Sequence, residues 1–226
     1  RSLFKIFTPG STILNEEQII TNNIMCVWIE KKNPTLIRPN SSLVCGISVL
    51  DNHSGKCYIH EYNISNYSHN PSSYEELERF YSIYNPNEIF IIYNNFTDEQ
   101  INTIKQWCSI SCSIRIINLQ EKSYFMENAK KCEKQVFQKE QILQFYNVDY
   151  DEFCETNLFN TYEIAKQSFC FLLDCIYNLN PDITKKIHQP KIYNSDLNLI
   201  LANHSLKQLN MLDDNKHQGK LSSVVN

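Results

Sequence analysis

Acidic side chains near the ends of predicted strands could support hydrolytic chemistry. Asp51 and Glu61 end two strands that we expect to form a hairpin, and Glu30 and Glu88 border two others. Two-metal nucleases need carboxylates gathered on neighbouring strands. A hairpin holds Asp51 and Glu61 far apart, so we interpret Asp51 as an acceptor for the backbone of its turn. The sequence therefore predicts no catalytic residue.

Histidines and cysteines offer a second chemical candidate. His53, Cys57 and His60 have a spacing that resembles a metal site. They span the predicted hairpin, however, and Cys57 and His60 should point to opposite faces of one strand. Cys108 and Cys112 lie at a predicted helix end without a Cys-x-x-Cys pair, which favours structural thiols. The sequence predicts neither a metal-binding nor a cofactor-binding residue.

Basic residues form two small clusters in a chain whose net charge is −4. This charge argues against a broad phosphate-binding surface but not against local DNA contacts within a larger assembly. Lysines at helix ends are usually solvated. The functional alternative is contact with the DNA backbone, for which the candidates are Lys185, Lys186 and Lys191. The other cluster comprises Lys130, Lys131 and Lys134.

The elements that position these residues alternate in the first half of the chain. Short apolar runs predict five strands, at residues 24–29, 43–50, 56–61, 88–93 and 113–118. Helices are predicted from residue 74 to 83, with Ser72 as N-cap, and from 98 to 108, with Thr97 as N-cap. Three strands in hairpin order followed by helix, strand, helix and strand predict an α/β fold, a ribonuclease-H-like mixed five-stranded sheet flanked by helices.

The second half of the chain has helical patterns. Periodicity is broken between residues 124 and 145, and an apolar stripe with helical spacing runs from Leu158 to Ile176. Residues 191–201 should be extended, and a helix should begin near Asn203. The α/β domain is thus expected to be followed by a mostly α-helical region. No apolar run reaches 18 residues, so no membrane span is predicted.

The two ends of the sequence indicate a part of a longer polypeptide. Residues 203–226 have the pattern of a helix, a polar loop and the start of a second helix. A helix that is not completed cannot bury its apolar face. At the other end, Pro9 and Gly10 form a strong turn signal close to residue 1. We therefore expect that the function of this chain is that of one part.

Several short motifs occur in an order and spacing that are typical of one protein family. They are Thr8-Pro9-Gly10-Ser11-Thr12, Asn22-Asn23-Ile24, residues 46–55 with Asp51-Asn52-His53-Ser54-Gly55, residues 201–211, and residues 219–226. Together they resemble the connector domain and the start of the lever domain of the MutS family of DNA mismatch repair proteins. Ala202, Ser205, Gln208 and Lys220 depart from the family pattern. These departures leave the subfamily open, and the composition of the chain would suit a divergent viral or organellar lineage.

The resemblance implies an arrangement of domains. Residues 1–20 would be a linker from a mismatch-reading domain, 21–122 the connector and 123–226 the start of a helical lever or core domain. The family's mismatch wedge is a Phe-x-Glu motif; Phe153-Cys154-Glu155 has these letters but lies in the acidic helical half. No phosphate-binding G-x-x-x-x-G-K-[ST] motif occurs. ATP and Mg²⁺ would bind an ATPase domain beyond residue 226.

The resemblance also implies a function and partners. The intact protein would be an ATPase that binds mismatched double-stranded DNA as a homodimer or heterodimer and contacts a MutL-type partner. This chain would couple DNA binding to the ATP-driven conformational change, without catalysis of its own. The alternatives are a ribonuclease-H-fold nuclease or resolvase acting on DNA, and a scaffold without a nucleic-acid role. Nine cysteines without a disulfide spacing favour a reducing intracellular compartment.

Overall fold

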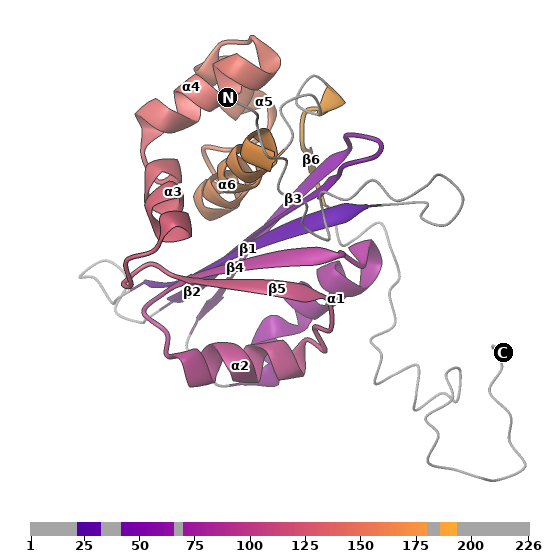
Figure 1. Ribbon diagram of the computed structural model, residues 1–226, viewed down its shortest axis with the longest axis vertical. Helices are drawn as coiled ribbons and strands as arrows, with labels where there is room; N and C mark the ends of the chain where they lie inside the picture. The colour runs from indigo at the N-terminus through magenta and orange to yellow at the C-terminus, as the bar shows by residue number, and fades with distance from the viewer. Residues whose placement is uncertain (1–21, 33–41, 66–69, 180–185, 194–226) are drawn as a thin grey trace, which may run out of the picture. The chain divides into compact units, whose positions relative to one another are not determined.

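The computed structural model describes residues 22–32, 42–65, 70–179 and 186–193 (Figure 1). The strands are β1 Asn23–Lys32, β2 Ser42–Asp51, β3 Cys57–Ser65, β4 Glu88–Asn94, β5 Ser113–Asn118 and β6 Lys191–Ile192. A 3₁₀ turn, η1, spans Pro71–Tyr74. The helices are α1 Glu75–Tyr84, α2 Asp98–Trp107, α3 Tyr124–Cys132, α4 Gln135–Tyr146, α5 Tyr150–Thr156 and α6 Glu163–Leu179.

The strands form one mixed sheet in the order β5-β4-β1-β2-β3-β6. β1, β2 and β3 are successive antiparallel neighbours, whereas β4 lies parallel to β1 and β5 parallel to β4. Five strands in this order and direction are the ribonuclease-H-like arrangement that the sequence predicts. β6 adds a sixth strand, parallel to β3. The predicted fold class is therefore confirmed, with one strand more than expected.

Helices cover both faces of the sheet, as Figure 1 shows. α1 and α2 lie on one face, and α3 to α6 lie on the other. β1 contributes alternate side chains to both cores: Cys26 and Trp28 face α6, and Val27 and Ile29 face α1 and α2. All four are completely buried. A strand buried on both faces has no polar side, which explains its continuous apolar run.

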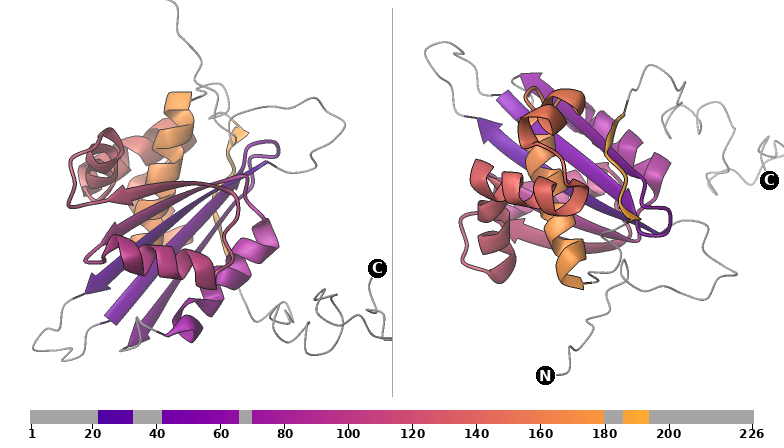
Figure 2. Two further views of the ribbon diagram at one scale, coloured as in Figure 1. Left: turned by 60° about the horizontal axis from the view of Figure 1, so that its bottom comes forward. Right: turned by 90° about the horizontal axis from the view of Figure 1, so that it is seen from above.

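Helix α6 crosses the sheet and is the central element of its face (Figure 2). It contacts β1, β2 and β3. A buried hydrogen bond of 2.7 Å joins the hydroxyls of Ser48 and Ser168. The predicted stripe began at Leu158, but the helix begins at Glu163 because the backbone of Leu158 has a φ of 53°. A left-handed residue cannot continue an α-helix.

The compact unit extends past the predicted boundary at residue 122. The core on the α6 face joins Phe90 and Ile92 of the sheet to Phe169 and Leu172 of α6. One compact unit extends as far as Tyr193. Helices α3 to α6 thus belong to the α/β layer and cover one face of the sheet. The sequence did not show this, because helical periodicity identifies the apolar face of a helix but not the surface against which it packs. The functional roles of the domains stay predictions, and residues 1–20 and 194–226, for which a linker and part of the helical region are predicted, lie outside the described residues.

The two predicted helix caps have different outcomes. Thr97 forms a capping box with Gln100, whose backbone N–H donates to the threonine hydroxyl, so this prediction is confirmed. The prediction for Ser72 is wrong. Asn70 accepts a hydrogen bond from the Ser72 N–H and caps the 3₁₀ turn that precedes α1. Pro71 at the first position of that turn explains the early start, since proline favours it.

The cysteines are free thiols, and eight of the nine are buried. Burial raises the pKa of Cys45 and of Cys170 to about 12. Both thiols therefore stay protonated at neutral pH, which agrees with a structural role. Within the described parts of the chain, no helix has the length and apolar character needed to cross a membrane.

Candidate functional site

The hairpin between β2 and β3 is organised by one carboxylate. Asp51 accepts hydrogen bonds from the N–H groups of Asn22 at 3.1 Å and His53 at 3.0 Å, and from the hydroxyl of Ser54 at 2.6 Å. Burial alone would raise the pKa of Asp51, but the hydrogen bonds from Ser54, His53 and Asn22 lower it below its ordinary value. Asp51 is therefore a turn acceptor, as the sequence predicts.

We expect Asp51→Asn to destabilise the protein by about 1 kcal/mol at neutral pH, because these hydrogen bonds are charge-assisted but partly solvated. The lowered pKa means that this stabilisation is present above the ordinary pKa of 3.8 and disappears as the pH falls through the folded value. Urea unfolding at several pH values measures the difference. The exposed Glu155→Gln is the control. A difference that grows towards acid pH would refute this role.

A short segment from the second half of the chain lies along this hairpin. The N–H of His188 donates to the carbonyl of Gly55 at 2.8 Å, and the N–H of Tyr193 donates to the carbonyl of Ile59 at 2.8 Å. Gly55 has a φ of +72°, and a Cβ there would lie 2.0 Å from the carbonyl oxygen of Lys186. Only glycine therefore fits both the turn and the contact.

Side chains of the same segment reach both cores. Ile187 and Ile192 pack with the core on the α6 face, and Tyr193 packs with the core on the α1 face. The Tyr193 ring meets Phe80 edge-on, with centroids 5.4 Å apart. We call residues 51–57 together with residues 186–193 the joint. The joint attaches segment 186–193, which is distant in sequence, to the edge of the sheet. The residue that follows Tyr193 lies outside the described part of the chain.

The predicted DNA-backbone candidates belong to the joint or its border. Lys186 and Lys191 are exposed, so both ammonium groups are accessible to an anionic partner. Lys185 lies outside the described residues. No finding tests a contact of these lysines with DNA, and it stays a prediction.

The acidic residues weighed for nuclease chemistry have separate structural partners. Glu61 accepts hydrogen bonds from the N–H groups of Ile164 and Ala165 at 2.8 and 2.9 Å, and so binds the N-terminus of α6. Glu88 is completely buried, and its carboxylate lies 2.7 Å from Nε of Arg115. Among the described residues, no group of three or more histidine, cysteine, aspartate or glutamate side chains could hold a metal ion.

The His53, Cys57 and His60 pattern is divided by the sheet. Cys57 packs in the core on the α6 face. His60 stacks on Phe80, on the α1 face, with ring centroids 6.1 Å apart. The opposite orientation of Cys57 and His60 is thus confirmed. Phe153 is also buried, packed against Phe159, so it has no exposed ring to insert between bases.

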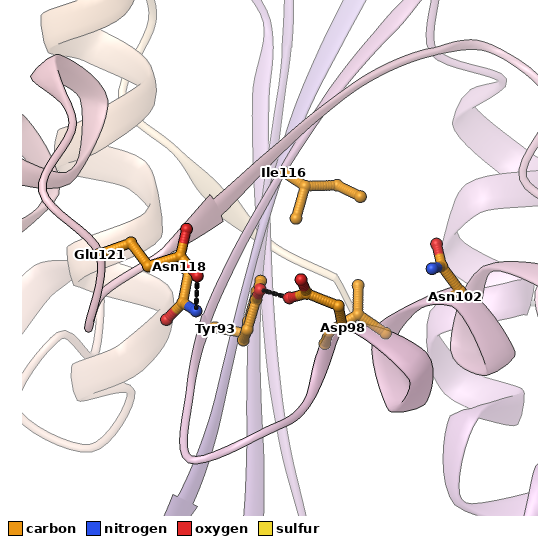
Figure 3. Close-up of a pocket in the computed structure, with 7 residues that line it drawn as sticks. Tyr93, Asp98, Asn102, Ile116, Asn118 and Glu121 are labelled. Atoms are coloured by element: carbon orange, nitrogen blue, oxygen red, sulfur yellow. Dashed lines mark hydrogen bonds between the residues drawn. The ribbon is translucent and has the colours of Figure 1, made fainter.

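A pocket of about 270 Å³ opens at the carboxyl ends of β4 and β5 (Figure 3). Ligands of open α/β sheets bind at such ends. Tyr93 donates a hydrogen bond to Asp98, and Asn118 donates one to Glu121 at 3.2 Å. Burial, with the hydrogen bond to Asp98 and its charge, raises the pKa of Tyr93. The two carboxylates make this pocket suited to a basic group and unsuited to phosphate.

Sequence reasoning did not identify Gly55 as a contact residue, nor Arg115 as the partner of Glu88. Gly55 belongs to the predicted hairpin, but its contact with Lys186 joins positions far apart in the chain and so leaves no local signal. For Arg115, by contrast, the local sequence contained an indication of a partner. It is a charged residue between Ile114 and Ile116 in a short apolar strand, which indicates a specific partner.

Comparison with known proteins finds a similar curated sequence and similar solved structures, two of which are described below. A DNA mismatch repair protein mutS homolog from Acanthamoeba polyphaga mimivirus is 23% identical, over 99% of this chain. This match confirms the resemblance to the MutS family and agrees with a divergent viral lineage. The chain spans 21% of the length of that relative. No family model matches the sequence.

Two of the similar solved structures are a Fowlpox virus resolvase with Holliday junction DNA and the Fowlpox virus Holliday junction resolvase. They are 18% and 17% identical, with TM-scores of 0.36 and 0.37. Each match covers 69% of this chain and 99% of the other. These scores are too low to establish a common fold, so the fold assignment depends on the order and direction of the strands.

Proposed function

We propose, from the resemblance of this chain to the MutS family of DNA mismatch repair proteins, that it is a coupling module of a larger protein. The observation that carries the proposal is a match along 99% of the chain to about a fifth of a mimivirus mutS homolog. A segment of that relative length suits one module of a larger protein. The module would transmit a conformational change between mismatched DNA and an ATPase domain, without catalysis of its own.

The joint supports this proposal physically. Coupling requires an element whose equilibrium both sites can bias. The segment 186–193 reaches both cores and is held to β3 by a strand of only two residues. Because its ladder with β3 has only two residue pairs, we expect it to separate from the sheet more easily than the longer strands. A rotation applied beyond residue 193 would therefore act on the sheet through the joint.

At the level of the whole protein, the proposal includes ATP and Mg²⁺ binding, a homodimer or heterodimer, and a MutL-type partner. Lys186 and Lys191 would contact the DNA backbone. The rival proposal, a nuclease or resolvase on the same sheet, would need carboxylates other than Glu61 and Glu88. Glu61 holds the start of α6, and Glu88 faces Arg115. Mg²⁺-dependent cleavage of branched DNA by this chain, abolished by Asp51→Asn, would favour the rival.

We expect Gly55→Val in the full-length protein to weaken the stimulation of ATP hydrolysis by mismatched DNA at least fivefold. Valine at this position is strained at positive φ and collides with the Lys186 carbonyl, so it separates segment 186–193 from the hairpin. ATP hydrolysis without DNA and mismatch binding at equilibrium should change little. Steady-state ATPase assays with matched and mismatched duplexes measure the effect.

The control is Ser54→Ala, which removes a hydrogen bond within the same hairpin and, among the described residues, no hydrogen bond to segment 186–193. Thermal unfolding of the 226-residue chain with Gly55→Val shows whether the sheet itself stays folded. Full mismatch stimulation in a Gly55→Val protein, with the joint demonstrably open by amide exchange, would contradict the coupling role.

A further inference from the structure

A second pocket, of about 370 Å³, lies among β4, β5, α3 and α6, away from the joint. Its apolar part consists of Phe90, Tyr124, Phe125, Cys175 and Leu179. Its polar part consists of Arg115, Asn128 and Asn178. Ligand sites are commonly concave and mostly apolar, with a few placed polar groups, and this volume is in their range.

Arg115 is held in place but keeps most of its hydrogen-bonding capacity. Its Nε is 2.7 Å from the carboxylate of the buried Glu88. Its guanidinium carbon lies 5.9 Å from the ring centroid of Phe90 and 5.5 Å from that of Phe125. The two terminal nitrogens have no hydrogen-bond partner among the described residues. A fixed planar fork with free N–H groups suits a phosphate oxygen or a flat ring.

The two asparagines present complementary groups. Asn128 accepts from Nζ of Lys131 at 3.4 Å through its oxygen, which leaves its amide nitrogen to donate. Asn178 donates to the carbonyl of Asp174 at 2.8 Å, which leaves its oxygen to accept. One donor and one acceptor in an aromatic pocket match the hydrogen-bonding edge of a nucleobase. The basic groups near the site are Arg115 and Lys131, and the acidic groups are Glu88 and the half-buried Asp174.

Tyr124 supplies an aromatic surface at the rim. Tyr124 is 64% exposed, although aromatic residues of this size are usually more buried. Its ring stands edge-on to Phe125, with centroids 5.6 Å apart, so a face stays free. Exposed aromatic faces stack with nucleobases, whichever base is present.

We propose that this pocket binds a nucleotide unit, with the base stacked on Tyr124 and hydrogen-bonded to Asn128 and Asn178, and the phosphate on Arg115. The unit is a free nucleotide or an unstacked nucleotide of single-stranded DNA. The proposal is independent of the coupling role, because the pocket and the joint share no residue.

Binding to the 226-residue chain is measured with a labelled short oligodeoxyadenylate by fluorescence anisotropy, and with deoxyadenosine monophosphate as competitor. We expect Tyr124→Ala to weaken binding about tenfold, the effect of losing one stacking contact. Arg115→Lys keeps the charge facing Glu88 but loses the planar fork, and should also weaken binding. The matched controls are Arg79→Lys, which changes an ion-paired arginine on α1, and Val136→Ala, which truncates an exposed apolar residue on α4.

Side-chain amide resonances of Asn128 and Asn178 report on the site independently of stability. Both should shift during the titration. Equal affinity for the mononucleotide and the oligonucleotide assigns a free nucleotide, and tighter binding of the oligonucleotide assigns single-stranded DNA. Failure of both probes to bind, or binding that Tyr124→Ala and Arg115→Lys leave unchanged, overturns the proposal. The coupling role would survive that outcome, since Gly55→Val tests it separately.

Discussion

Replacing Gly46 by valine should lower the free energy of unfolding by about 3 kcal/mol or more, a typical cost of severe overpacking. Gly46 lies in the middle of β2, directly beneath the first turn of α6. A Cβ at this position would lie 2.4 Å from the backbone nitrogen of Ala165 and 2.4 Å from the carbonyl carbon of Ile164. Because both atoms belong to backbone, no side-chain rotation relieves the overlap.

The expected loss is specific to the contact between β2 and α6. The helix would also move away from Glu61, whose carboxylate accepts from the first N–H groups of α6. Urea unfolding followed by circular dichroism measures the change. Asn63→Val is the matched control, because it places the same side chain at an exposed position of β3. A Gly46→Val protein within about 1 kcal/mol of the parent would show that α6 does not rest on β2 as described.

The second large effect is expected for Arg115→Leu, which should destabilise the fold by about 3 kcal/mol. This change removes the cation that faces Glu88, while the glutamate stays completely buried. Leucine keeps much of the packing against Phe90 and Phe125, so the loss is mainly electrostatic. Loss of the arginine takes away a charge-assisted hydrogen bond from a carboxylate that the protein interior solvates poorly.

The double variant Arg115→Leu with Glu88→Gln separates charge from packing. Glutamine removes the buried negative charge at nearly the same volume, so the double variant should recover at least half of the lost stability. Chemical denaturation of the two single variants and the double variant closes the thermodynamic cycle. Strictly additive losses would mean that the pair does not interact in the folded protein.

Local patterns predicted the strands and the turn because their causes are local. β1 is continuously apolar since Val27 and Cys26 enter opposite cores. Asp51 was assigned to the hairpin from the ordinary behaviour of aspartate in turns, and its hydrogen bonds to His53 and Ser54 confirm this. These features depend on neighbours a few positions away, which the sequence displays directly.

Other features could not be predicted because they join distant positions. The apolar stripe of α6 indicates that one face of the helix is buried. That this face packs on the sheet becomes visible only in the structure, for example in the contact between Gly46 and Ala165. The joint depends on the pairing of Ile59 with Ile192, more than a hundred residues apart. For the same reason the sequence did not show that the compact unit continues past residue 122 as far as Tyr193. Sequence periodicity contains no information on which surfaces meet.

The most direct test of the coupling role is hydrogen exchange of the joint in the full-length protein, measured by mass spectrometry. Peptides covering residues 51–57 and 186–193 are compared without ligand, with ATP, with mismatched DNA, and with both. The account predicts that ATP and mismatched DNA each change exchange in these peptides, while peptides of the central strand β1 stay protected. Identical exchange of the joint in all four states would contradict it.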